Sequence, residues 1–119
     1  MSGIWNGIYA VYMTGVEGQG FAMMLFQNGV LTGADPLGVL FDGKYEVADD
    51  QSLDGMLRVT VPGGATTIQG ASFGPDGFAY EVHLHIEDVA RKGGYFNVVT
   101  PLGNVNVRLE LLRALGDEN

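Results

Sequence analysis

The sequence predicts an all-β fold, an up-and-down antiparallel barrel of about eight strands in one domain spanning residues 1–119. Three observations support this prediction. Short β-prone runs recur at the spacing of roughly 8–12 residues that is typical of sandwiches and barrels. Asn28-Gly29 joins two of these runs, and this pair favours a tight hairpin turn that needs positive φ at both central positions. Finally, residues 78–87 alternate strictly between apolar and polar side chains.

The first half of the chain contains three of the predicted strands. Residues 8–13 are rich in aromatic and β-branched side chains and predict the first strand. A glycine-rich connection leads to a second strand at 21–27, and a short third strand at 30–32 follows the turn. The second strand is apolar on both faces, so we expect one face to meet the core and the other to be covered as well. An oligomer interface is one way to cover it.

The middle of the chain predicts two further strands around an acidic turn. Residues 39–47 form the fourth strand, in which Gly43 indicates a bulge or bend. Residues 49–55 form the acidic turn, and 56–61 alternate as a fifth strand. Residues 65–77 predict either a short strand or a half-turn of helix.

Three strands follow, at residues 78–87, 95–100 and 105–111. The alternation in 78–87 predicts a half-buried antiparallel strand with Phe78 on its inner face. Because short turns join consecutive runs, we favour a barrel over a sandwich, and closure also removes exposed strand edges.

Composition excludes several classes of function. The chain has no cysteine, which excludes disulfides, thiolate metal sites and a cysteine nucleophile. Its net charge of -8, with dispersed basic residues, argues against direct nucleic-acid binding. The chain has no secretory signal pattern and no apolar run of the roughly 20 residues that span a bilayer. We therefore expect a cytoplasmic protein without a membrane association.

Two histidines are the main candidates for chemistry. His83 and His85 project from one face of the predicted strand at 78–87, together with Glu81 and Glu87. Such a pair can bind a metal, but a solvated outer face is the simpler interpretation, and the sequence shows no marked further ligand on a neighbouring strand. No serine lies in the context of a nucleophile. We expect no enzymatic activity, no metal and no cofactor.

Two groups of residues are candidates for binding. Asp49, Asp50 and Asp54 form either an ordinary solvated turn or an acidic loop that recognises a basic protein partner. Phe21, Met23 and Met24 are candidates for a dimer interface or a cavity, because methionine adapts to irregular binding surfaces. A barrel of about eight strands is just wide enough for packed side chains or one small ligand.

Four short glycine-containing motifs lie in the first half of the chain: Gly7-Ile8-Tyr9, residues 18–20, residues 28–35 and Gly43-Lys44-Tyr45. Together they resemble the GrlR-type negative regulators of type III secretion genes, and the resemblance covers mainly residues 3–60. It implies a lipocalin-like barrel that forms a homodimer and sequesters a basic transcriptional activator. In that family, four consecutive carboxylates contact the activator, whereas this chain has Asp49 and Asp50 at the matching place.

The sequence thus leads to two functional hypotheses. The first is a non-enzymatic bacterial regulator that acts by binding a basic protein, as the resemblance implies. The alternative is a protein that binds a small apolar, lipid-like ligand inside the barrel.

Overall fold

The structure, a computed structural model, describes residues 3–16, 18–64 and 76–116. These residues form eight strands and one short 3-10 helix, η1. The elements are β1 (Gly7–Gly15), β2 (Gly18–Gln27), β3 (Val30–Ala34), β4 (Leu40–Val47), β5 (Leu53–Val61), β6 (Phe78–Ile86), η1 (Asp88–Lys92), β7 (Tyr95–Thr100) and β8 (Gly103–Ala114). The described part of the chain contains no helix with the length and apolarity needed to cross a membrane.

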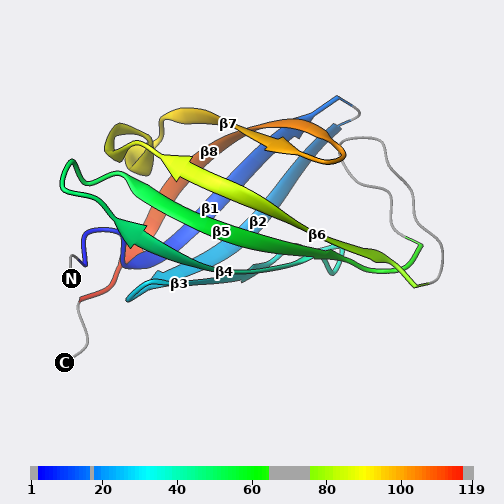
Figure 1. Cartoon of the computed structure of the whole chain (residues 1–119), viewed down its shortest axis with the longest axis horizontal. Helices are drawn as coiled ribbons and strands as arrows, with labels where there is room; N and C mark the ends of the chain where they lie inside the picture. Colours follow the sequence, from blue (N-terminus) through cyan, green and yellow to red (C-terminus); the bar gives the residue numbers. More distant parts are fainter. Residues whose placement is uncertain (1–2, 17, 65–75, 117–119) are drawn as a thin grey trace.

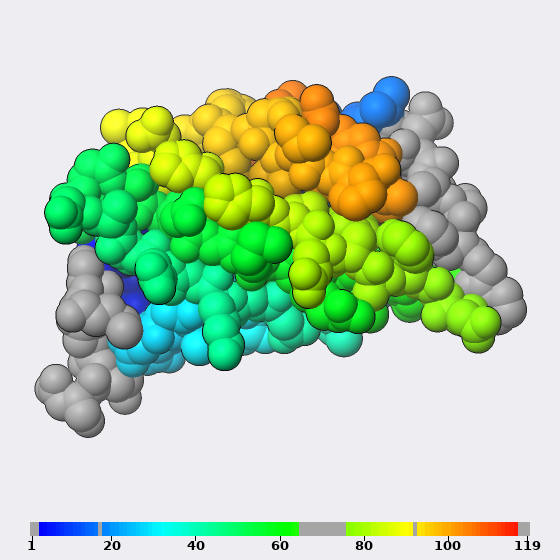
Figure 2. Space-filling view, in the orientation of Figure 1, coloured from blue at the N-terminus to red at the C-terminus, as the bar shows by residue number. Residues whose placement is uncertain are grey.

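The strands form one antiparallel sheet that curls into a nearly closed barrel (Figure 1). Their order is β6-β5-β4-β3-β2-β1-β8-β7, so β1 pairs with both β2 and β8. The two edge strands, β6 and β7, lie next to each other and bring the sheet close to closure. In the space-filling view the side chains of β6 and β7 adjoin along this seam (Figure 2). The predicted all-β, up-and-down barrel of eight strands is confirmed.

The barrel has two different ends. Both chain termini, η1 and the β2–β3 and β4–β5 turns lie at one end, on the left of Figure 1. The β1–β2, β3–β4 and β7–β8 turns lie at the other. We call the first the closed end and the second the open end.

The β2–β3 hairpin follows directly from its two turn residues. Asn28 and Gly29 have φ values of 50° and 88°, the positive pair that a type I′ turn requires. Gln27 pairs with Val30 across the turn, so the hairpin has the tight two-residue connection that the sequence predicts. The Gly29 carbonyl also accepts a hydrogen bond from the Tyr45 amide at 2.9 Å, which connects the turn to β4.

Alternation along the strands separates the inside of the barrel from the outside. On β2, Met24 and Phe26 are buried, whereas Met23 lies on the outer face with 44% of its surface exposed. On β6, Leu84 and its inward neighbours are buried as predicted. Phe78 is 40% exposed because the barrel wall ends at this first residue of β6.

Two details differ from the sequence prediction. Strand β5 begins at Leu53, so Asp54 belongs to a strand and not to the preceding acidic turn. The sequence predicts a bulge or a bend at Gly43. The bulge is absent, because the pairing of β4 with β3 and with β5 keeps its register through this residue. The irregularity lies instead in the β1–β8 pairing, between Ile8 and Tyr9. Most of the segment predicted at 65–77 lies outside the described residues.

Gly43 is required by a close approach between strands. A Cβ atom built at this position would collide with the Met56 carbonyl oxygen of β5, which is backbone and has little freedom to move. We therefore expect Gly43→Ala to lower the free energy of unfolding by about 1–3 kcal/mol. Urea denaturation of the variant measures this change.

Gly18→Ala is the matched control, since no described atom lies within 4 Å of a Cβ at the start of β2. Its free energy of unfolding should stay within about 0.5 kcal/mol of the parent value. Equal destabilisation of the two variants would contradict the steric explanation.

Candidate ligand cavity in the barrel

The barrel encloses a cavity of about 310 Å³. Its wall is formed by inward-facing side chains of all eight strands, and almost all of these side chains are apolar. The lining residues include Met24, Leu31, Phe41, Leu57, Val82 and Val107. Well-packed protein interiors contain few voids larger than a water molecule, so a cavity of this size is a candidate binding site.

The cavity exists because the large buried side chains gather at the closed end. The Phe26 ring lies 6.0 Å from Trp5, 4.8 Å from Tyr9 and 5.7 Å from Tyr45, measured between ring centroids. These aromatic rings fill the interior of the barrel at its closed end. Nearer the open end the wall combines aliphatic side chains with the rings of Phe21, Phe41 and Tyr80, and the centre is unfilled.

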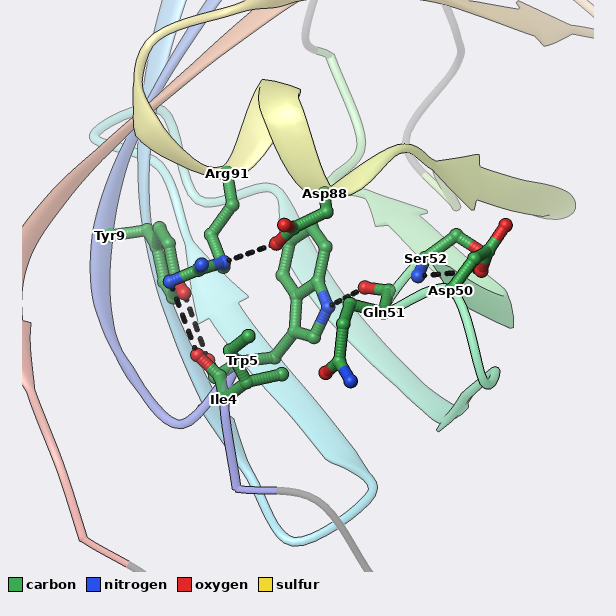
Figure 3. Close-up of polar contacts among 8 residues, drawn as sticks. All are labelled: Ile4, Trp5, Tyr9, Asp50, Gln51, Ser52, Asp88 and Arg91. Atoms are coloured by element: carbon green, nitrogen blue, oxygen red, sulfur yellow. Dashed lines mark hydrogen bonds and ion pairs between the residues drawn. The ribbon is translucent and has the colours of Figure 1, made fainter.

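The segment before β1 seals the closed end (Figure 3). The Trp5 indole Nε1 donates a hydrogen bond to the Gln51 carbonyl in the β4–β5 turn at 2.9 Å. The Trp5 carbonyl accepts a hydrogen bond from the buried Tyr9 hydroxyl at 3.0 Å. Arg91 of η1 pairs with Asp88 at 3.0 Å and donates to the Ile4 carbonyl at 3.5 Å. These contacts thus connect the segment before β1 to the β4–β5 turn and to η1 at the closed end.

Asn6 connects the closed end to Gly116, the last residue that the structure describes. Its side chain is 3% exposed, and its Nδ2 donates to Asn28 Oδ1 at 3.1 Å and to the Gly116 carbonyl at 3.3 Å. Its Oδ1 accepts a hydrogen bond from the Asn28 amide at 3.0 Å. Burying an amide costs free energy unless it is hydrogen-bonded, and these contacts satisfy Asn6. Sequence reasoning missed both Trp5 and Asn6, because their partners are distant in the chain.

The cavity reaches the surface at the open end. Its lining there includes Leu37, which is 70% exposed, and the polar side chains of Gln19, Asp35 and Thr100. Asp35 Oδ1 accepts hydrogen bonds from the Leu37 amide at 2.9 Å and the Val39 amide at 3.0 Å. An Asp-Pro pair is typical of a turn, so this loop had a sequence signal. Nothing in the pattern indicated that the loop borders a cavity.

The candidate residues on β2 are divided between the two faces. Met24 points into the barrel and lines the cavity, whereas Met23 lies outside. Phe21 lines the cavity at the open end, and its ring also packs 5.4 Å from the Tyr12 ring, with Phe21 37% exposed.

The three candidate aspartates have different surroundings. Asp49 and Asp50 are exposed in the β4–β5 turn. Asp50 Oδ1 accepts hydrogen bonds from the Ser52 hydroxyl at 2.6 Å and the Ser52 amide at 3.0 Å, and these bonds lower the pKa of Asp50 (Figure 3). Asp54 is the second residue of β5 and lies on the outer face of that strand, just after the turn.

Asp54 is also the neighbour of the two histidines. Its Oδ1 lies 2.7 Å from His83 Nε2 and 3.7 Å from His85 Nδ1, and all three side chains are more than half exposed. The structure therefore places a carboxylate from the adjacent strand beside this pair, which the sequence did not identify. No three histidine, aspartate or glutamate side chains in the described residues are arranged to hold a metal ion.

Comparisons of this chain with protein-family models, with curated proteins and with solved structures found no match. The resemblance to GrlR-type regulators therefore stays a prediction from the sequence.

Tyr9 predicts how the closed end responds to alkaline pH. Burial raises the pKa of its phenol from 10.0 to about 12, an effect that the nearby positive charge of Arg91 partly offsets. Above pH 10 the unfolded chain loses this proton while the folded protein retains it, so stability falls as the pH rises towards about 12. We expect Tyr9 to contribute a loss of about 2–3 kcal/mol across this interval.

Urea denaturation at several pH values measures this loss. Tyr9→Phe should flatten the pH dependence, while Tyr95→Phe should leave it unchanged because Tyr95 is 75% exposed. An unaltered slope in Tyr9→Phe would show that another group is responsible.

Proposed function

We propose that this protein binds a small apolar molecule inside its barrel. The observation that supports the proposal is the apolar cavity of about 310 Å³, which is sealed at the closed end and reaches the surface at the open end. Ligand sites are typically concave and apolar with a few polar groups, and barrels commonly hold ligands at their mouths.

The size of the cavity favours one small ligand. Ligand pockets span roughly 300–1,000 Å³, so this cavity lies at the lower limit. An unfilled cavity destabilises a protein because its wall loses packing contacts, at a cost of ~24 cal/mol per Å³ in a series of engineered cavities. Domains have only about 5–15 kcal/mol of stability, so an empty cavity of this size would remove a substantial part of it. Ligand binding is a role that would explain why the cavity is present.

The lining favours binding over chemical reaction. Among the described lining residues there is no histidine, lysine or arginine, and the side chains with polar groups are those of Gln19, Asp35, Tyr80 and Thr100. A nucleophile paired with a base, the usual requirement for covalent catalysis, does not occur among these residues. We therefore propose a carrier or sensor of an apolar molecule and not an enzyme.

A neutral fluorescent probe tests the proposal. N-phenylnaphthylamine has about 17 non-hydrogen atoms, and at ~0.3 kcal/mol per atom its binding free energy is about 5 kcal/mol. This corresponds to a Kd on the order of 100 µM. We expect saturable binding of one molecule per chain with a blue-shifted emission. Emission that rises linearly with probe, without saturation, would contradict the proposal.

Two adjacent methionines provide matched variants. Met24→Trp adds bulk inside the cavity and should weaken probe binding about tenfold or more, whereas Met23→Trp adds the same bulk outside and should leave it unchanged. Circular dichroism and urea denaturation establish that both variants fold. Val107→Phe, on β8, narrows the cavity from another strand and should also weaken binding. If both inward variants folded and bound normally, the probe would not occupy the barrel.

A second candidate function is association with other proteins, and the outer face of the sheet favours it. Tyr12, Phe21 and Met23 are partly exposed on neighbouring strands, with Phe21 opposite Tyr12 in the register. Arg108 and Glu110 lie beside them on β8 and form an ion pair at 3.7 Å. An apolar patch bordered by both signs of charge suits an isologous dimer, in which the same surface meets its own copy.

A regulator of the kind that the GrlR-type resemblance implies would use this face for dimerisation. It would use the carboxylates at and beside the β4–β5 turn to bind a basic activator. Asp49 and Asp50 lie in the β4–β5 turn, and Glu46 lies opposite Asp54 on the adjoining strands. These carboxylates support the proposal of a basic protein partner, because complementary charge accelerates and orients association.

Sedimentation velocity tests the dimer. Met23→Glu places a charge at the centre of the outer apolar patch and should convert a dimer to monomers, while Lys44→Glu, on β4 away from the patch, should have no such effect. A parent chain that sediments as a monomer at high micromolar concentration would contradict the dimer without affecting the proposed ligand binding.

A further inference from the structure

We propose that the open end of the barrel selects ligands by the charge of their polar end, accepting an amine or an alcohol and disfavouring a carboxylate. The ligand class is then an amphiphile with an apolar body and a hydrogen-bond donor at one end. This inference rests on the proposed function, because it concerns the same cavity.

The first support is the position of Asp35. Asp35 lines the cavity at the open end, where β3 leads into β4, and it is only partly exposed. A ligand whose apolar body occupies the barrel would bring its polar end to this region, because the wall nearer the closed end is apolar. A donor or a cation beside Asp35 gains a charge-assisted hydrogen bond, whereas a carboxylate meets a like charge.

The second support is that Asp35 is held in place by its own loop. Oδ1 accepts the Leu37 and Val39 amides, and the Asp35 amide in turn donates to the Val39 carbonyl at 3.0 Å. Oδ2 makes no hydrogen bond with the residues that the structure describes. One oxygen therefore fixes the orientation of the carboxylate and the other remains available to a ligand.

The third support is the distribution of positive charge. None of the basic side chains that the structure describes lines the cavity. Arg58 and Arg108 pair with glutamates on the outer face, and Arg91 pairs with Asp88 at the closed end. Among the described residues, a carboxylate ligand would thus find no cation lining the cavity, and the chain has a net charge of -8. Burial of an unpaired charge is costly, so such a ligand is disfavoured.

Competition among three ligands with the same chain length tests the inference. Dodecylamine, dodecanol and dodecanoate, each kept below its solubility limit and any micelle concentration, are titrated as competitors of N-phenylnaphthylamine bound to the parent protein at neutral pH. We expect the amine and the alcohol to compete at least about tenfold more strongly than the carboxylate. Equal or stronger competition by dodecanoate would overturn the inference while leaving the proposed function intact. Failure of the probe itself to bind would count against both.

Two isosteric variants separate the local charge from the net charge. Asp35→Asn keeps an acceptor for the Leu37 and Val39 amides, so the loop retains its hydrogen bonds, and the preference for amine over carboxylate should fall to less than about threefold. Asp42→Asn removes the same charge from the outer face of β4, where the carboxylate contacts Thr32. It should leave the preference unchanged, and an equal effect of both variants would show that only net charge matters.

Discussion

The attachment of the N-terminal segment to the closed end is the constraint on which the rest of the structure depends. Trp5 fills the barrel beside Phe26 and reaches the β4–β5 turn through its indole nitrogen, while Asn6 binds the β2–β3 turn and the end of the chain. A barrel of eight strands needs large side chains to fill it. The rings of Trp5, Tyr9, Phe26 and Tyr45 fill the closed end, and the cavity occupies the interior beyond them.

Local chemistry explains which parts of the fold could be predicted. Asn28-Gly29 determines its own turn by φ preference, and the alternation at 78–87 determines which side chains of β6 face inward. Trp5 and Asn6 could not be predicted in this way, since they act on partners up to 110 positions away along the chain. Gly43 was recognised as special, but the predicted bulge is absent, because the sequence does not reveal the close approach of the Met56 carbonyl from the neighbouring strand.

The candidate site was predictable in kind and not in detail. Period-two alternation necessarily places Met23 and Met24 on opposite faces, but the sequence does not indicate whether the interior is filled. Asp35 illustrates the limit most clearly. Its turn is recognisable from Asp-Pro, yet its place at the mouth depends on the arrangement of β1–β2, β3–β4 and β7–β8 around one rim. Likewise, Asp54 approaches His83 only through the β5–β6 register.

The seam between β6 and β7 has a consequence for solubility and for entry to the interior. Edge strands of a sheet can template the addition of strands from other chains, which leads to aggregation. Here the two edges lie against each other, so each shields the other from a foreign strand even though the sheet ends at this seam. Strands elsewhere in the wall are joined by backbone hydrogen bonds, whereas the described residues of β6 and β7 form no such pairing. Widening of the barrel at this seam would therefore break no strand pairing among them.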